Sequence, residues 1–363
     1  MSVRPLSEAD IPQVADLYWN YMRLRKGSAP PALLTFLREL FFANPFCDSA
    51  SPSLVYESGD GRVVGFLGGS VRKMSVCGEP IRVVFGGNLV VHPDFRSGLA
   101  APRLLNNFLA AEYDLSVTDS ANEISRKILQ RMGLQLVPSL NIHWARPLQP
   151  IRYAAHTMIR AKGIAASSLK FAAQPFCAMA DSLASRVSLS PFRQAKSRLH
   201  GENMDVQTLL DCLIEFRKGY LLWPEYDINS LTWLLNFMER RPSRGKLRKI
   251  VIRDATQKIV GWYIYYVKPG SVGEVVQIGG EPKATKDVLD HLFYDAWEQG
   301  VIALHGMVDT RRMPDYSDKG CFFTCRGGWT ITNPRKAGIL ELLERGDAFF
   351  SRLDGEWALD PGD

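Results

Sequence analysis

One stretch of this sequence combines the residue types that hold a phosphate group. An apolar run ends at Val91, and a helical pattern follows after a short turn. The turn and helix start contain Arg96, Ser97, Gly98, Leu99, Ala100 and Ala101. Small side chains let backbone N–H groups approach phosphate oxygens, a helix start carries partial positive charge, and Arg96 adds a full charge. The stretch therefore predicts a pyrophosphate-binding turn, with Arg103 as a further contact.

Two side chains near this turn are candidates for moving a proton. Asp119 follows the next apolar run, 115–117, and we expect it at the mouth of the same sheet. Its alternative role is to cap the helix expected from about Asn122. His92 precedes a proline in the expected loop, where a histidine is more often solvated than catalytic. Asp119 is therefore the candidate base, and helix capping stays open as its alternative.

The elements that would position these residues mix helices and strands. Residues 3–5 form a candidate strand, and Ser7 with Asp10 three residues later marks the start of a helix. Periodicity predicts further helices at 31–42, 101–113 and 122–132, and strands at 54–57, 63–71, 81–91, 115–117 and 140–145. This order predicts a mixed α+β domain.

A similar order of elements follows in the second half of the chain. The pattern predicts helices at 206–219, 228–239 and 284–300, and strands at 249–253, 260–267, 273–278 and 301–307. The similar order suggests an internal duplication. We expect a first domain at 1–148, a basic, Ala- and Ser-rich helical linker at 149–203, and a second domain at 204–363.

Three segments of the first half resemble motifs of one acyltransferase superfamily. NLVVHPDFRSGLAAPRLL, at 88–105, resembles motif A of the GNAT (Gcn5-related N-acetyltransferase) superfamily. DSANEISRKILQRMGL, at 119–134, resembles a later motif of that family, and VRPLSEADIPQVADLY, at 3–18, resembles its usual opening. Two motifs in the right order are more specific than either alone. The chain thus looks like a tandem GNAT-like bacterial protein.

The resemblance implies a cytoplasmic N-acyltransferase that binds acetyl-CoA or another acyl-CoA. It implies that a backbone N–H near Leu89, Val90 or Val91 holds the thioester carbonyl, while the 96–101 turn holds the pyrophosphate. In the family the asparagine at the position of Asn122 tends to touch the cofactor as well as cap a helix. An amine of a small molecule, sugar or peptide would then attack the thioester directly, aided by positioning, an oxyanion contact and a base.

The sequence departs from the family pattern at positions that bear on catalysis. Leu99 stands where the family has its first glycine, and Leu129 stands where it has a tyrosine that protonates the departing thiolate. Gly86, Gly87 and Asn88 stand where a glutamate is often found, which leaves Asn88 and Asp119 as catalytic candidates. The alternatives are a non-catalytic acyl-CoA sensor or scaffold, and a FemAB-like transferase with another donor such as aminoacyl-tRNA.

The second half resembles a GNAT-like domain without a phosphate-binding turn. Residues 261–266 and 273–281 resemble family strands, but the following turn, 281–286, lacks the arginine and the glycines. We expect a degenerate domain that shapes the acceptor site. In the chain terminus, 349–357, Asp354 and Glu356 are candidates to reach an acceptor, with a sealing role for this tail as the alternative.

Five aromatic residues of the second half also admit two interpretations. They could line a groove for a sugar or an acyl chain, or they could pack on a core as alternating strand residues do. These residues are Trp223, Tyr226, Trp262, Tyr263 and Tyr265.

The bulk composition limits the remaining function classes. The chain has 363 residues, more than one core usually fills, with 46% hydrophobic and 23% charged residues. A net charge of +6 fits an anionic ligand and does not point to nucleic acid. Six cysteines without CxxC spacing and few histidines predict no metal site. We see no signal peptide or membrane span, and expect at most weak peripheral membrane contact through 151–173.

Overall fold

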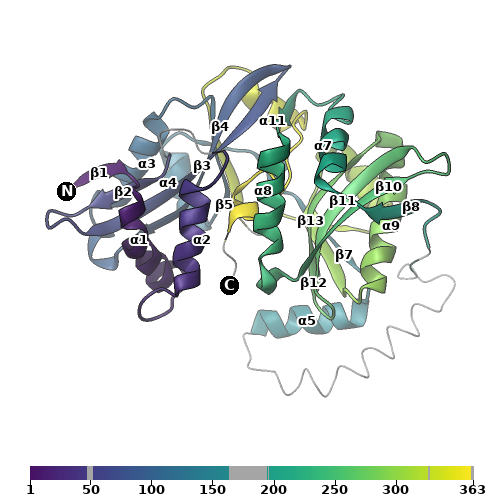
Figure 1. The fold of residues 1–363 in the computed structure, drawn as a ribbon, viewed down its shortest axis with the longest axis horizontal. Helices are drawn as coiled ribbons and strands as arrows, with labels where there is room; N and C mark the ends of the chain where they lie inside the picture. Colours follow the sequence, from purple (N-terminus) through teal and green to yellow (C-terminus); the bar gives the residue numbers. More distant parts are fainter. Residues whose placement is uncertain (47–51, 163–193, 195, 326–327, 361–363) are drawn as a thin grey trace. The chain divides into compact units, whose positions relative to one another are not determined.

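A computed structural model describes residues 1–46, 52–162, 194, 196–325 and 328–360, and they group into two compact units (Figure 1). Unit 1 comprises Met1–Asn141, Gly219–Met238 and Gly327–Asp363, and unit 2 comprises Ile142–Lys218 and Glu239–Arg326. Each unit combines a mixed sheet with helices. The α+β class expected from the sequence is confirmed.

The described residues of unit 1 form an eight-stranded sheet in the order β1-β2-β3-β4-β5-β15-β6, with β9 paired to β3. Its strands are β1 (Ser2–Pro5), β2 (Leu54–Glu57), β3 (Val63–Val76), β4 (Glu79–Val91), β5 (Leu115–Ala121), β6 (Gln135–Leu136), β9 (Leu222–Pro224) and β15 (Trp329–Pro334). The β4–β5 pair is parallel, and the other pairs are antiparallel. The parallel pair is the feature that builds the site described below.

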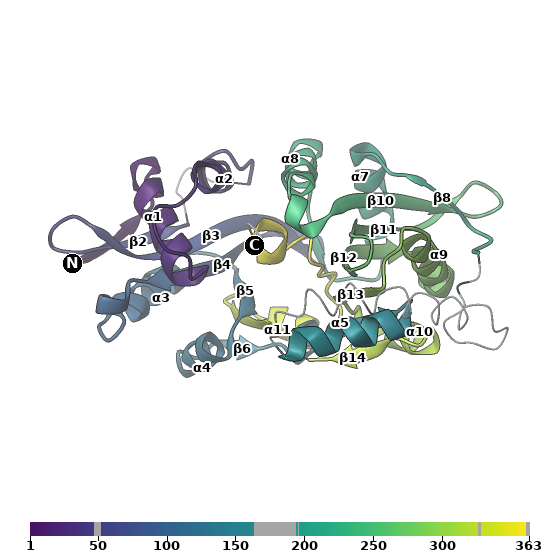
Figure 2. The same ribbon diagram turned by 90° about the horizontal axis from the view of Figure 1, so that it is seen from below.

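Helices cover both faces of this sheet. Figure 2 shows α1 (Ile11–Leu17) and α2 (Pro31–Phe42) on one face, and α3 (Ala100–Ala110) and α4 (Glu123–Arg131) on the other. The unit also includes α8 (Ile228–Glu239), apart from its last residue, and α11 (Ile339–Arg345). The apolar stripe of α3, with Leu104 and Phe108, packs against Val84 and Val91 of the sheet. The helical periodicity in the sequence therefore marks the buried faces correctly.

Unit 2 has a seven-stranded sheet among its described residues, in the order β14-β7-β13-β12-β11-β10-β8. Its strands are β7 (His143–Pro147), β8 (His200–Asn203), β10 (Lys246–Arg253), β11 (Ile259–Val267), β12 (Val272–Gly280), β13 (Ala303–Met307) and β14 (Phe322–Thr324). Its helices are α5 (Pro150–Lys162), α7 (Val206–Glu215), α9 (Thr285–Glu298) and α10 (Met313–Asp318). As in unit 1, a single parallel pair, β12–β13, lies within an otherwise antiparallel arrangement of the described strands.

The chain does not fill the two units in simple succession. The strand expected at 140–145 begins at His143 and pairs with β13 in unit 2. Conversely, β15 from the far end of the chain pairs with β5 in unit 1, with Thr332 opposite Val117. The units therefore differ from the contiguous division at 148 and 203, because the sheet edge at β5 is completed by a strand distant in sequence.

The expected linker at 149–203 is described only in part. Its first helix is α5, and most of the remainder lies outside the described residues. The 151–173 segment, for which weak membrane contact is expected, is described as far as Lys162, within α5, and its remainder lies outside the described residues.

The aromatic residues of β11 settle one of the open alternatives. Trp262, Tyr263 and Tyr265 are all fully buried, and the two tyrosines pack in a core cluster with residues of α9 such as Leu292. These three aromatics are core residues, so the interpretation as groove lining is wrong for them.

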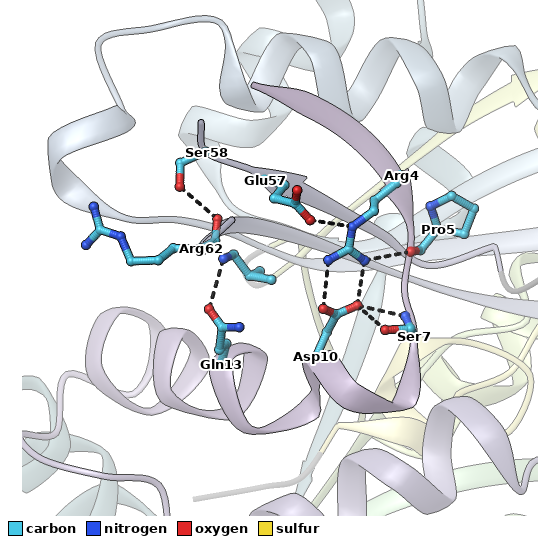
Figure 3. Close-up of polar contacts among 9 residues, drawn as sticks. Arg4, Pro5, Ser7, Asp10, Gln13, Glu57, Ser58 and Arg62 are labelled. Atoms are coloured by element: carbon cyan, nitrogen blue, oxygen red, sulfur yellow. Dashed lines mark hydrogen bonds and ion pairs between the residues drawn. The ribbon is translucent and has the colours of Figure 1, made fainter. Parts of the chain in front are cut away.

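Polar contacts fix the amino end of unit 1 (Figure 3). Arg4 on β1 donates hydrogen bonds to both carboxylate oxygens of Asp10, at 2.7 and 2.8 Å, and one to Glu57 on β2 at 2.6 Å. Asp10 also accepts from the backbone N–H and the hydroxyl of Ser7. The Arg4 contact lowers the pKa of Asp10 to about 2. The helix start expected at Ser7 and Asp10 is confirmed, and Asp10 also joins it to the sheet.

Candidate functional site

The parallel pair of unit 1 opens part-way along its length. β4 and β5 pair through Val83–Leu115, Val84–Ser116 and Phe85–Val117, and the pairing ends there. A pocket of about 350 Å³ lies at this point, with polar lining residues from β5 and the start of α4. They are Ser116, Thr118, Ser120, Asn122 and Ser125. The volume is in the range of small-molecule sites.

β4 reaches the pocket through a bulge. Phe66 on β3 faces Val90, whereas Gly68 faces Gly87, so β4 carries one extra residue between these pairs. Asn88 lies in this bulge with a φ of 55°, in the left-handed region. A bulge interrupts the ladder of backbone hydrogen bonds, so backbone groups near Asn88 are available to a ligand. Asn88 and Leu89, both predicted site residues, line the pocket.

Gly87 makes room for a carboxylate that comes from the end of the chain. A Cβ atom at Gly87 would lie 1.2 Å from Oε1 of Glu356. The other carboxylate oxygen, Oε2, accepts hydrogen bonds from the hydroxyls of Thr118 and Ser120, both at 3.0 Å, and from the backbone N–H of Asp119 at 3.2 Å. A glutamate of the tail thus lies against β4 at Gly87, one of the positions where the family often has a glutamate of its own.

Glu356 and Asp119 form a pair of carboxyl groups. Burial, followed by the charge of Asp119, raises the pKa of Glu356 well above its usual range. Burial also raises the pKa of Asp119, whose Oδ1 has no hydrogen-bond partner among the described residues. A negative charge on either of two neighbouring buried carboxyl groups disfavours ionisation of the other. Glu356 lines the pocket and Asp119 does not, so Glu356 is the member that faces a ligand.

The alternative role of Asp119 as a helix cap is wrong. Asn122 caps α4, since its side-chain oxygen accepts a hydrogen bond from the backbone N–H of Ser125 at 2.9 Å. Asn122 also lines the pocket. The residue therefore has the capping role, and its position permits contact with a ligand as well.

The predicted pyrophosphate turn is an exposed turn at the start of α3. Leu99 is 60% exposed, and no side chain of the described residues caps the helix. Arg96 lies in the turn and donates a hydrogen bond to the backbone carbonyl of Val91 at 3.0 Å. This hydrogen bond ties the Arg96 side chain to the end of β4, while the partial positive charge of the following helix start favours an anion. The residues present thus fit a pyrophosphate group.

The remaining predicted site residues are placed around this turn. Ser97 and Gly98 lie exposed in it, and Ala100 and Ala101 begin α3. Val90 and Val91 have buried side chains, so only their backbone can meet a ligand. Arg103 donates long hydrogen bonds of 3.5 Å to Tyr56 and to the carbonyl of Met1. Residues 96–101 do not line the pocket. They follow Leu89, which does line it, along the chain after β4 ends at Val91.

One group of pocket residues had no signal in the sequence. Arg23 donates a hydrogen bond to Oδ1 of Asp360 at 2.9 Å, and the hydroxyl of Tyr18 donates to the same oxygen at 3.4 Å. Met22 and Trp357 line the pocket with them. These contacts join the helical segment that follows α1 to the tail, across more than three hundred residues, a separation that local sequence patterns cannot reveal.

The wall of the pocket on the side of α3 and α4 is apolar. It consists of Leu105, Phe108, Leu109, Ile128, Leu129 and Leu134. Leu129 is 7% exposed and stands at the position of the family's tyrosine, so no hydroxyl is supplied from there. This wall suits the apolar part of a ligand.

The corresponding turn of unit 2 carries a charge of the opposite sign. Glu281 precedes α9 and forms ion pairs with Lys258 and with Lys283. A carboxylate near a helix start competes with a phosphate for the same partial positive charge. This described turn of unit 2, 281–286, is therefore less suited to an anion than the α3 turn of unit 1.

Two general features of the described residues bear on function. No group of three or more histidine, cysteine, aspartate or glutamate side chains among them is arranged to hold a metal ion. In the same part of the chain, no helix has the length and apolar character needed to cross a membrane.

Comparisons with known proteins show the fold. No protein-family model matches the sequence, and no curated protein matches it. A solved structure from Enterococcus faecalis, described as a probable N-acyltransferase, is similar with a TM-score of 0.59 and 12% identity, over 92% of this chain and 72% of that one. A GCN5-related N-acetyltransferase from Anabaena variabilis has a TM-score of 0.58 and 10% identity, over 92% and 72%.

A third similar structure is the N-myristoyltransferase of Saccharomyces cerevisiae with bound myristoyl-CoA. Its TM-score is 0.53 at 10% identity, over 91% of this chain and 77% of that one. These likenesses cover most of the chain, and the GNAT fold expected from the motifs is confirmed. The likeness at this level of identity shows the fold, and the activity has to be argued from the site.

Proposed function

We propose that unit 1 transfers an acyl group from an acyl-CoA thioester to an amine, with Glu356 as the general base. The observation that carries the proposal is the Glu356 carboxylate, held by three donors in the pocket where β4 and β5 separate. Support for the class of reaction comes from the GNAT fold, which the chain shares with structures described as N-acyltransferases.

Glu356 supplies what a direct attack by an amine requires. The acceptor nitrogen forms a bond to the thioester carbon, the carbon–sulfur bond breaks, and the sulfur leaves with the electron pair. The nitrogen must lose a proton in this process, and a carboxylate with a raised pKa is a better acceptor for it than an ordinary glutamate. Leu129 provides no acid for the thiolate, so the proton reaches the sulfur from solvent or from the acceptor side.

The donor would be held at two places. The exposed turn with Arg96 and the uncapped start of α3 would hold the pyrophosphate, and the bulge at Asn88 and Leu89 would offer a backbone N–H to the thioester carbonyl. Asn122 at the start of α4 is a further polar contact from the pocket wall.

We propose acetyl-CoA or a longer acyl-CoA as donor. The apolar wall formed by α3 and α4 accommodates the apolar part of the donor. The acceptor is proposed to be a small-molecule, sugar or peptide amine, because the pocket presents the carboxyl groups of Glu356 and Asp360. A cytoplasmic location and weak membrane contact through 151–173 stay predictions, as does a role of the second domain in shaping the acceptor site.

Binding and turnover test the proposal separately. Calorimetry with coenzyme A thioesters should show binding to the wild type and weaker binding to Arg96→Ala, and a screen of acyl-CoA donors against amines should show release of free thiol. Absence of binding to the wild type would refute the proposal. Binding without thiol release for any amine would instead favour the sensor or scaffold alternative, to which the missing tyrosine at Leu129 also points. Strong, salt-dependent RNA binding would favour a donor such as aminoacyl-tRNA.

A further inference from the structure

The turn that precedes Glu356 is built around a buried aspartate. Asp354 is 1% exposed, and its Oδ2 accepts hydrogen bonds from the backbone N–H and the hydroxyl of Ser351, at 2.7 and 2.6 Å. Its Oδ1 accepts a hydrogen bond from the hydroxyl of Tyr226 at 2.7 Å. The backbone N–H of Asp354 donates to the carbonyl of Ser351 at 3.1 Å and closes the turn. A buried carboxyl group is costly to leave unsatisfied, so these donors fix its position.

The turn leaves little freedom for Glu356. Gly355 lies directly on β5, because a Cβ atom there would be 1.8 Å from Oδ2 of Asp119. Gly355 is the single residue between Asp354, whose position is fixed, and Glu356. Gly355 itself packs against β5. The position of Asp354 thus fixes the position of the Glu356 backbone, from which its side chain extends.

Tyr226 is in turn held by the sheet of unit 1. It follows β9, which pairs with β3 through Trp223 opposite Ser75. The hydroxyl of Ser75 also donates a hydrogen bond to Glu225 at 2.6 Å. Trp223 stacks on Phe349 of the tail with ring centroids 4.3 Å apart. The segment that carries Tyr226 is therefore attached both to β3 and to the tail.

We propose that Tyr226 and Asp354 are positioning residues for Glu356. They act through the turn at Ser351, which fixes the point from which Glu356 reaches the pocket. The kinetic part of this inference rests on the function proposed above, while the placement of the Glu356 carboxyl group can be measured without turnover.

The charged surroundings give the expected direction of the effect. Glu356 faces Asp119 on β5, whereas Asp354 faces Tyr226 and the positive charge of Arg72 on β3. Loss of the Tyr226 hydroxyl loosens the turn, so Glu356 gains solvent and moves away from Asp119. Both changes stabilise its charged form. Burial and the Asp119 charge outweigh the hydrogen bonds from Thr118 and Ser120, whose loss acts in the opposite direction, so the pKa of Glu356 should fall.

The experiment uses the full chain with carbon-13 label in the glutamate carboxyl groups. The Glu356 signal is assigned by its loss in Glu356→Gln, and its titration midpoint is compared in the wild type, Tyr226→Phe and Ser351→Ala. Tyr113→Phe is the matched control, because it also removes a hydroxyl from a buried tyrosine of unit 1 that does not line the pocket. The midpoint should fall by about one pH unit in Tyr226→Phe, a tenfold change in proton affinity, and stay unchanged in Tyr113→Phe.

The kinetics of acyl transfer should show the same displacement of Glu356. In Tyr226→Phe, kcat should fall roughly tenfold to a hundredfold with an unchanged KM for acyl-CoA, and the acidic limb of the pH profile should shift to lower pH. Ser351→Ala gives the same comparison if Tyr226→Phe does not fold. A Glu356 midpoint in Tyr226→Phe and Ser351→Ala equal to that of the control would overturn the inference. A shifted midpoint in a protein that transfers no acyl group would retain the positioning role and refute the proposed function.

Discussion

The glycine at position 87 offers a direct way to displace Glu356 from the pocket without altering either carboxylate. In Gly87→Ala the new methyl group would lie 1.2 Å from Oε1 of Glu356. The carboxyl group must therefore retreat by about 2 Å to restore an ordinary contact of 3.4 Å. Such a movement is larger than the tolerance of a hydrogen bond, so the contacts with Thr118, Ser120 and the Asp119 backbone are lost.

The expected result is a loss of turnover with little loss of donor binding. A misplacement of about 1 Å costs on the order of a hundredfold in rate, so kcat of Gly87→Ala should fall by at least that factor. The affinity for coenzyme A should stay close to the wild-type value, because the Arg96 turn is unchanged. Steady-state thiol release measures the first quantity and calorimetry the second.

Gly59→Ala is the matched control for this prediction. Gly59 also belongs to unit 1, and a Cβ atom there would meet no atom of the described part of the chain within 4 Å. The kinetic constants of Gly59→Ala should equal those of the wild type. If Gly87→Ala were as active as Gly59→Ala, the placement of Glu356 would not matter, and the reasoning that makes it the base would be refuted.

Three further predictions concern the Arg96 turn, the titration of Glu356 and the Arg4–Asp10 contact. Arg96→Ala should raise the Kd for coenzyme A by about tenfold, measured by calorimetry, with equal affinity contradicting the role of the turn. Because the pKa of Glu356 is raised, kcat should increase as pH rises through a value above the usual 4.5, and this limb should disappear in Glu356→Gln; an unchanged limb would exclude Glu356 as its source. Asp10→Asn should destabilise the protein by about 2 kcal/mol at pH 7 in urea unfolding. The folded-state pKa of Asp10 is lowered to about 2, so this difference should be complete above the usual 3.8 and disappear as pH falls towards 2; a constant difference would contradict the Arg4 contact.

The local elements of unit 1 could be predicted because their signals are local. Ser7 with Asp10 marked a helix start, and the apolar positions of α3 marked its buried face. Asn88, Leu89 and Asn122 were identified through motifs, and all three line the pocket. Periodicity and short motifs report what neighbouring residues do, and these features depend on neighbouring residues.

Two features could not be predicted because they depend on contacts between residues far apart in sequence. They are the place of Glu356 in the pocket and the pairing of β15 with β5. Glu356 meets the backbone of Asp119 across 237 positions of sequence, and β15 meets β5 across a similar separation. No pattern within the tail indicates which strand it will meet, so Glu356 could be named from sequence only as one of two acidic residues. Gly87 carried an indirect signal, since a glycine in a central strand often marks a close approach by another group.

The most direct test of the proposed function compares Glu356→Gln with the wild type in two measurements on the same preparation. Glu356→Gln keeps the size of the side chain and removes the base. The proposal predicts that both proteins bind an acyl-CoA with the same affinity, while thiol release in the presence of an amine acceptor is about a hundredfold or more slower in the variant. Equal rates of thiol release in the two proteins would contradict it.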